Sequence, residues 1–170
     1  MHHMIDTSTR EAAVMAQGGK YPTAGEIRIW RDYIETAEAL RSEIASRLQN
    51  DSALSPGDYS VLLALSEEHG RRLRSSDLAA AVGWERSRLS HHLRRMESRG
   101  LVWRDECVAD SRGAEVVLTE AGAEALSEAT PSHLRAVREL FLTPLSPEQT
   151  TAVRNVTATL RASLDAHSGL

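Results

Sequence analysis

Residues 75–122 read SSDLAAAVGWERSRLSHHLRRMESRGLVWRDECVADSRGAEVVLTEAG, and this stretch decides the fold. The polar residues 75–77 are expected to begin a short apolar helix, which Gly83 interrupts. A second helix is expected over 85–99, with Gly100 as a left-handed cap at its C-terminus. A helix, a tight turn containing glycine and a second helix together form the helix-turn-helix pattern.

Two short strands are expected after the second helix. Residues 101–104 alternate in polarity, residues 115–118 are rich in β-branched side chains, and the sequence Asp-Ser-Arg-Gly at 110–113 is typical of a hairpin tip. Leu73, between two arginines, lies in a further short extended stretch. A strand pair this short suits a wing beside a helix-turn-helix rather than an independent sheet.

Apolar and polar side chains fall on opposite sides of the helix over 85–99. Leu89, Leu93 and Met96 recur at i, i+4 and i+7, so they form one apolar face. The outer face and its flanks contain hydrogen-bond donors and no acid, as a reader of guanine edges and phosphates requires. We therefore predict that the following side chains bind DNA: Arg86, Ser87, Arg88, Ser90, His91, Arg94 and Arg95. The alternative is an ordinary solvated basic face.

The predicted wing adds a second DNA-binding element. Arg112 stands at the hairpin tip, where an arginine side chain can enter a minor groove. Asp110 would be repelled by phosphate if it were unpaired, so we expect it to orient Arg112 or another arginine such as Arg104.

The charge is distributed unevenly along the chain. The 170 residues carry a net charge of −4, which by itself disfavours nucleic acid as a partner. Residues 71–112, however, hold ten arginines and six acidic residues, a charge of +4, so the remainder carries −8. A basic segment in an acidic frame steers DNA to one face. The chain has nineteen arginines and only Lys20 as lysine, a bias that suits phosphate recognition and that a GC-rich genome also produces.

Composition and patterning predict a cytoplasmic protein that does not enter a membrane. No apolar run approaches the roughly 20 residues of a membrane span. The first ten residues lack a charged-then-apolar signal pattern. Cys107 is the single cysteine, which excludes an intrachain disulfide.

Long helices are expected on both sides of the central segment. A helix beginning at Ala24 has one apolar face, and Ser55-Pro56 is typical of the start of the next helix. Thr119 is an expected N-cap of a later helix, which Pro131 should kink or divide, and Ser146 begins the last helix as a capping box. We interpret residues 1–23 as a flexible N-terminal arm, 54–119 as the DNA-binding domain, and 24–53 with 120–170 as a helical dimerisation region.

Several motifs together resemble the MarR (multiple antibiotic resistance regulator) family of winged helix-turn-helix transcriptional regulators. They are LRRMESRGLVWR at 93–104, DSRG at 110–113 and VLTEAG at 117–122, in register with that family's pattern. Two departures concern the reading of DNA: Arg86 and Arg88 stand at positions that are often small or apolar, and CVAD at 107–110 replaces a common proline-containing turn.

The resemblance implies a mainly α fold with a small β-wing, in which long helices form an intertwined dimer. It implies that Ser87, Ser90 and His91 face bases, that the arginines of the same helix divide between bases and phosphates, and that Arg112 enters the minor groove. The apolar faces of the first and last helices would otherwise be exposed, so the dimer interface candidates are Ile27, Trp30, Ile34, Val153, Val156, Leu160 and Leu164.

Other sites receive less weight. An effector pocket is expected where the dimer helices meet the winged domain, with Trp30, Tyr33, Tyr59 and His69 as candidates, although these aromatic residues also suit a core. Redox sensing by Cys107 and a zinc site from scattered histidines are less favoured, and no metal or cofactor is expected. No enzyme constellation is present in the sequence.

The sequence thus predicts a DNA-binding transcriptional regulator whose partners are double-stranded DNA, a second copy of the chain and a small-molecule effector. Regulation by repression of a pseudo-palindromic operator is the leading hypothesis. The alternatives are a winged-helix module that binds an acidic protein and a nonspecific architectural DNA binder, although the latter needs a more uniformly basic surface.

Overall fold

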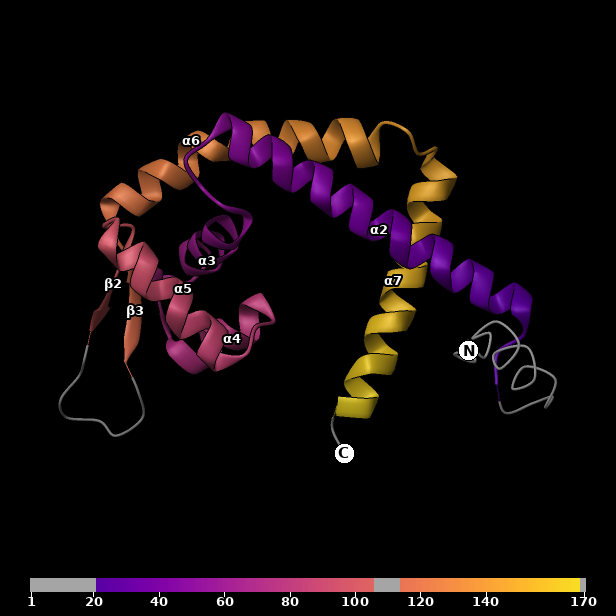
Figure 1. Ribbon diagram of the computed structural model, residues 1–170, viewed down its shortest axis with the longest axis horizontal. Coiled ribbons are helices and arrows are strands. Elements are labelled where there is room, and N and C mark those ends of the chain that lie inside the picture. Colours follow the sequence, from indigo (N-terminus) through magenta and orange to yellow (C-terminus); the bar gives the residue numbers. More distant parts are fainter. Residues whose placement is uncertain (1–20, 106–113, 169–170) are drawn as a thin grey trace, which may run out of the picture. The chain divides into compact units, whose positions relative to one another are not determined.

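The computed structural model describes residues 21–105 and 114–168 (Figure 1). The chain divides into two compact units, Met1–Ser42 and Glu43–Leu170. Helix α2 (Ala24–Asp51) begins and ends where the sequence predicted. Within the described residues no helix is long and apolar enough to cross a membrane.

Helix α3 (Pro56–Ser66) begins with the cap that the sequence predicted. The Ser55 hydroxyl accepts a hydrogen bond from the Asp58 backbone N at 3.1 Å, and the Asp58 carboxylate accepts one from the Ser55 backbone N at 2.9 Å. The short 3₁₀ turn η1 (His69–Arg71) follows, with Gly70 in the left-handed region at φ 75°. The predicted stop at Gly70 therefore lies just beyond the helix end.

The predicted helix-turn-helix is confirmed. It consists of α4 (Ser75–Val82), a turn in which Gly83 has φ 66°, and α5 (Arg86–Ser98), after which Gly100 has φ 71°. Positive φ values suit glycine because it has no Cβ, so these two residues end their helices at little conformational cost.

Three strands form an antiparallel sheet in the order β1 (Arg72–Arg74), β3 (Glu115–Leu118) and β2 (Val102–Asp105). The sequence predicted the β2–β3 pair, whose register runs from Val102↔Leu118 to Asp105↔Glu115. It predicted that the stretch around Leu73 is extended but not that it pairs with β3, through Leu73↔Val116.

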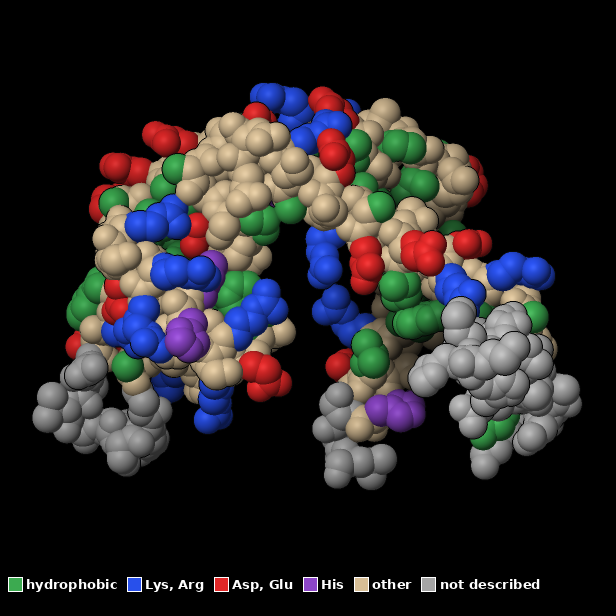
Figure 2. Space-filling view, viewed as in Figure 1, with side chains coloured by type: hydrophobic (Ala, Val, Ile, Leu, Met, Phe, Trp, Pro, Cys, Tyr) green, Lys and Arg blue, Asp and Glu red, His purple; other side chains and the backbone are tan. Residues whose placement is uncertain are grey.

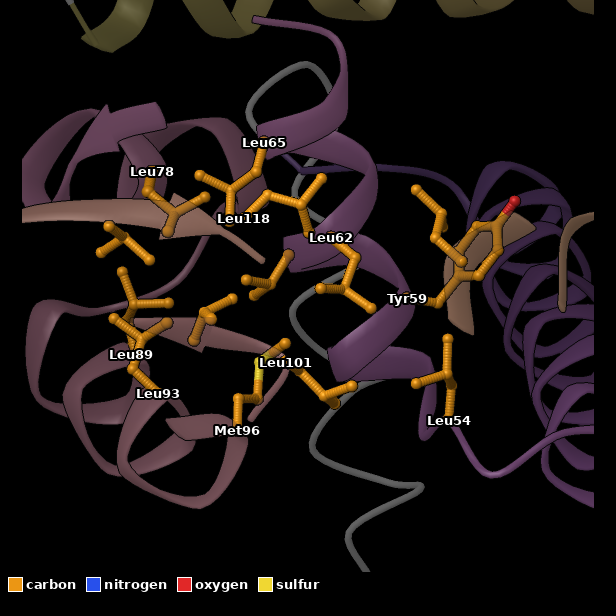
Figure 3. Close-up of a cluster of buried hydrophobic side chains, with 14 of the residues drawn as sticks. Leu54, Tyr59, Leu62, Leu65, Leu78, Leu89, Leu93, Met96, Leu101 and Leu118 are labelled. Carbon is orange, nitrogen blue, oxygen red and sulfur yellow. The ribbon is translucent and has the colours of Figure 1, made fainter. Parts of the chain in front are cut away.

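Helix α5 is fixed on the core by one face. Leu89, Leu93 and Met96 are at most 1% exposed, and they point from α5 toward Leu62 and Leu101 (Figure 3). Burial of each such side chain stabilises the fold by roughly 1.5–3 kcal/mol. The predicted apolar face of this helix is therefore confirmed.

Helix α6 (Glu120–Val137) continues through Pro131, so of the kink or division that the sequence predicted at this proline, the division does not occur. The proline removes one backbone donor, but Leu126, Ala129 and Ala136 are buried on both sides of it and hold the helix on the core. The π-helical turn η2 (Arg138–Leu142) follows, and α7 (Pro147–Ser168) begins at the predicted capping box, where Ser146 and Gln149 exchange hydrogen bonds.

The first turn of α6 closely approaches Leu101, the residue before strand β2, at Gly122. Thr119 caps the helix by accepting from the Gly122 backbone N at 2.9 Å, as predicted, and a Cβ on Gly122 would lie 2.1 Å from the Leu101 carbonyl oxygen. We expect Gly122→Ala to lower the free energy of unfolding by about 3 kcal/mol, because the backbone must move apart. Urea denaturation measures this change.

Gly25→Ala is the matched control. A Cβ at Gly25 would meet only the Thr23 hydroxyl, at 3.9 Å, so the free energy of unfolding should change by less than about 1 kcal/mol. Equal effects of the two substitutions would contradict the close packing of α6.

Candidate nucleic-acid interface

The outer face of α5 carries the predicted DNA-binding side chains. Six of them are exposed and Ser90 is half-buried; the exposed ones are Arg86, Ser87, Arg88, His91, Arg94 and Arg95. Figure 2 shows arginine and histidine side chains gathered over the part of the molecule that contains α5. Four of these exposed side chains are arginines, namely Arg86, Arg88, Arg94 and Arg95. Within the described residues, no carboxylate forms an ion pair with any of the four. They are therefore available to an anionic partner.

One flank of α5 borders the sheet. A cleft of about 280 Å³ lies there, lined by Ser75, Ser76, Arg86, Leu89, Ser90, Leu93 and Arg104. Arg104 of β2 donates to Glu97 from Nε at 2.9 Å and also from Nη2. These bonds hold the pKa of Glu97 below its ordinary value, so the acid at the end of α5 stays ionised and attached to the sheet.

The other flank of α5 contains an aromatic pair that the sequence analysis did not single out. The rings of Trp84 and His92 meet edge to face with centroids 5.1 Å apart. The guanidinium carbon of Arg88 lies 4.4 Å from the centroid of the Trp84 ring, and Nη2 of Arg95 lies 3.0 Å from Nδ1 of His92. The spacing of Trp84, Arg88 and His92 at four-residue steps could have revealed this stripe.

Asp58 connects this flank to α3. It is 2% exposed, and its carboxylate accepts from Nη1 of Arg99 at 2.7 Å while Nε2 of His92 lies 2.9 Å away. Burial alone would raise the pKa of Asp58, but the hydrogen bonds from Arg99 and Ser55 outweigh it and hold that pKa below its ordinary value. Asp58 is therefore an ionised group in the interior, opposite the recognition helix.

Burial is also the largest influence on His92. It lowers the pKa of His92 below the ordinary 6.5, and repulsion from Arg95 and Arg88 acts in the same direction, against the attraction of Asp58. His92 is therefore neutral near pH 7, although it lies beside a carboxylate.

The remaining predicted residues are placed as follows. Asp110, Arg112 and Cys107 lie outside the described residues. Of the effector candidates, Trp30, Tyr33 and His69 are exposed, whereas Tyr59 is buried and its ring lies 4.4 Å from that of His133. The described residues contain no group of three His, Cys, Asp or Glu side chains that could hold a metal ion.

The interface candidates on α2 and α7 differ in exposure. Trp30, Val156, Leu160 and Leu164 are exposed, whereas Ile27, Ile34 and Val153 are half-buried. Exposed apolar side chains in a row along one helix are unusual for a surface that faces water.

Helix α5 has a buried apolar face and an exposed face rich in hydrogen-bond donors, and it adjoins an antiparallel sheet. These features define a winged helix-turn-helix transcriptional regulator, and comparisons with known proteins agree. The family model described as "Bacterial regulatory protein, arsR family" matches residues 56–103. AbsC, a MarR family regulator from Streptomyces coelicolor, is 36% identical, with a TM-score of 0.79 over 87% of this chain and 99% of its own. Sco3205, a MarR family regulator from the same organism, was solved in complex with DNA. It is 37% identical, with a TM-score of 0.78 over 85% of this chain and 94% of its own.

A third relative has a more limited match. The transcriptional repressor MprA of Escherichia coli is 27% identical over 107 residues, which are 63% of this chain and only 60% of that repressor. The two Streptomyces structures, by contrast, match nearly the whole of their own length. This chain belongs to the MarR family of DNA-binding transcriptional regulators. The resemblance stated from the sequence motifs is thereby confirmed.

The pKa of His92 leads to a prediction about pH. Because the folded chain holds this pKa below 6.5, the unfolded chain binds the proton more readily, so the free energy of unfolding should fall as the pH drops below 6.5. His133, whose pKa burial also lowers, contributes in the same direction. We expect His92→Gln to make the free energy of unfolding less dependent on pH between about pH 5 and 7.

Urea denaturation at a series of pH values measures this dependence. His91→Gln, which replaces the exposed neighbouring histidine and leaves the contact between His92 and Asp58 in place, is the matched variant for comparison. If the free energy of unfolding of His92→Gln depends on pH as steeply as that of the wild type, the fold does not hold His92 neutral.

Proposed function

We propose that this regulator is a homodimeric repressor that binds a pseudo-palindromic operator through α5 and the wing, and that a small-molecule effector modulates this binding. The observation that carries the proposal is the group of four arginines on α5 that have no carboxylate partner among the described residues, on a helix whose back is locked into the core. The structure of Sco3205 with DNA and the name of MprA as a repressor support it.

In this proposal the side chains of α5 have distinct roles. Ser87, Ser90 and His91 face base edges, because the N-terminal part of a recognition helix lies deepest in the major groove. The four arginines divide between guanine edges and phosphates. Arg112 enters the minor groove from the chain segment between the paired strand ends Asp105 and Glu115, and Asp110 orients Arg112 or another arginine such as Arg104.

The dimer is proposed from the apolar faces of the flanking helices. Val156, Leu160 and Leu164 of α7 are 46–67% exposed and recur at four-residue steps, and Trp30 of α2 is 59% exposed. Pairing two copies about a two-fold axis would bury these side chains and place two recognition helices about one DNA turn apart. The domain boundaries predicted from the sequence belong to this proposal, as does an effector site among Trp30, Tyr33, Tyr59 and His69.

Selection of duplexes from a random DNA pool tests operator binding. We expect a two-fold symmetric motif whose affinity falls steeply with salt, since arginines displace phosphate counterions. Arg94→Ala should weaken binding to that motif roughly tenfold, the cost of one good contact to a base or phosphate. Fluorescence anisotropy at two salt concentrations measures both effects.

Arg135→Ala, which removes an exposed arginine on α6, should leave operator affinity nearly unchanged. If the wild type enriches no motif, or only an unsymmetric one, the proposed repressor is wrong. The better hypothesis for the function is then a winged-helix module that binds an acidic protein.

Leu160→Asp tests the dimer. A carboxylate at the centre of the apolar face of α7 should convert the dimer to a monomer in analytical ultracentrifugation, because burial of an unpaired charge costs several kcal/mol. Ala158→Asp places the same charge on the opposite side of the helix, where the chain is also exposed, and should leave the dimer intact. A Leu160→Asp protein that stays dimeric would exclude this face from the interface.

A further inference from the structure

A continuous stripe of four side chains runs along the flank of α5 that faces α3, and it consists of Trp84, Arg88, His92 and Arg95. The guanidinium carbon of Arg88 lies 4.4 Å from the centroid of the Trp84 ring, the rings of Trp84 and His92 meet edge to face, and Nη2 of Arg95 reaches Nδ1 of His92 at 3.0 Å. Two of the arginines proposed to bind DNA therefore rest on an aromatic pair in the free protein. Arg94, on the outer face, contacts the exposed His91 at 3.5 Å and not the aromatic pair, among the residues that the structure describes.

The aromatic pair is itself held by α3. A Cβ on Gly57 would lie 2.8 Å from both Cη2 of Trp84 and Cε1 of His92, so α3 approaches both rings as closely as a glycine permits. Beside this close approach, Nε2 of His92 lies 2.9 Å from the Asp58 carboxylate. The rings have no free space in which to tilt toward α3.

The chemistry of the neighbours fixes the proton on His92. An arginine can only donate, so Nδ1 of His92 must accept from Arg95, and the proton of the neutral ring lies on Nε2. There it faces the ionised carboxylate of Asp58, in a close electrostatic contact that is poorly aligned as a hydrogen bond. His92 thus links a buried anion in α3 to an exposed cation on α5.

We propose that Trp84 and His92 are positioning residues for DNA recognition, which fix the directions of Arg88 and Arg95 and thereby set the operator preference. This inference rests on the proposed binding of operator DNA by α5. Arginine has many rotamers, and holding the guanidinium in place before binding removes part of the entropy that its immobilisation costs. A fixed direction also determines which base pair the guanidinium can reach.

Operator variants with single base-pair changes test the role of Trp84. Arg88→Ala first identifies the base pairs whose preference depends on Arg88. Trp84→Leu, which removes the aromatic face but keeps apolar bulk, should reduce discrimination at those same base pairs about two- to fivefold, the usual strength of an exposed cation–π contact. Trp84→Phe keeps an aromatic face and should retain most of the discrimination.

The pattern across base pairs separates positioning from a loss of folding. A merely structural defect lowers the affinity for every sequence by the same factor and leaves the ratios between sequences unchanged. Gly57→Ala provides an independent perturbation, because it displaces both rings from α3 and leaves the amino-acid sequence of α5 unchanged. It should alter the preference at the base pairs that Arg88 and Arg95 determine.

Two substitutions of His92 separate its two contacts. Asn places an acceptor near the position of Nδ1 and can still receive the bond from Arg95, whereas Gln places a donor near the position of Nε2 and faces Asp58. Arg95→Ala first identifies the base pairs whose preference depends on Arg95. We expect His92→Asn to keep the discrimination at those base pairs. His92→Gln should reduce that discrimination about two- to fivefold, the range of one modest contact.

A measurement without DNA accompanies these titrations. In proton–nitrogen NMR spectra of the free protein, the Arg88 Nε–H signal should carry a ring-current shift that Trp84→Leu removes, whereas the Arg94 signal should stay in place. If the wild type selects no operator, the proposed function itself fails. If it selects one and Trp84→Leu and Trp84→Phe discriminate as the wild type does at every base pair, operator binding stands and the positioning role is overturned.

Discussion

Among the described residues, Asp58 is the one buried charged side chain, and the need to satisfy its carboxylate constrains how α3 and α5 pack. At 2% exposure it is too deeply buried to be solvated by water, so the protein must supply its partners. These partners come from separate places: the backbone N of Ser55 before α3, the guanidinium of Arg99 at the end of α5, and the imidazole of His92 in its middle. Because these partners hold one carboxylate, Asp58 fixes α5 against the start of α3.

This fixed helix explains how a chain of net charge −4 can bind DNA. The apolar face of α5 is buried in the core, and the charge of Glu97, near the end of this helix, is balanced by Arg104. The outer face therefore presents guanidinium, hydroxyl and imidazole groups that pair with no carboxylate of residues 21–105 and 114–168. The acidic remainder of the chain repels DNA elsewhere, which leaves one productive approach.

Local patterns in the sequence predicted the helix caps and the apolar face of the recognition helix, but missed the stripe of Trp84, Arg88 and His92, although its spacing is also local. The caps at Ser55, Thr119 and Ser146 and the apolar face of α5 each follow from spacings of three or four residues. The sequence did not predict the pairing of β1 with β3 or the contact of His92 with Asp58, because both join distant segments. Pro131 does not divide α6, because burial of residues on both sides of it outweighs the local helix-breaking preference of proline.

The two sides of α5 place different limits on how such a regulator can change its preference for DNA. Ser87, His91 and Arg94 project from the outer face and do not contact the core, so substitutions there can alter base reading at little cost in stability. Arg88 and Arg95, by contrast, are coupled through the aromatic pair to Asp58, which is buried and charged. A change on that flank must satisfy both the DNA and the core, which favours retaining the whole stripe together.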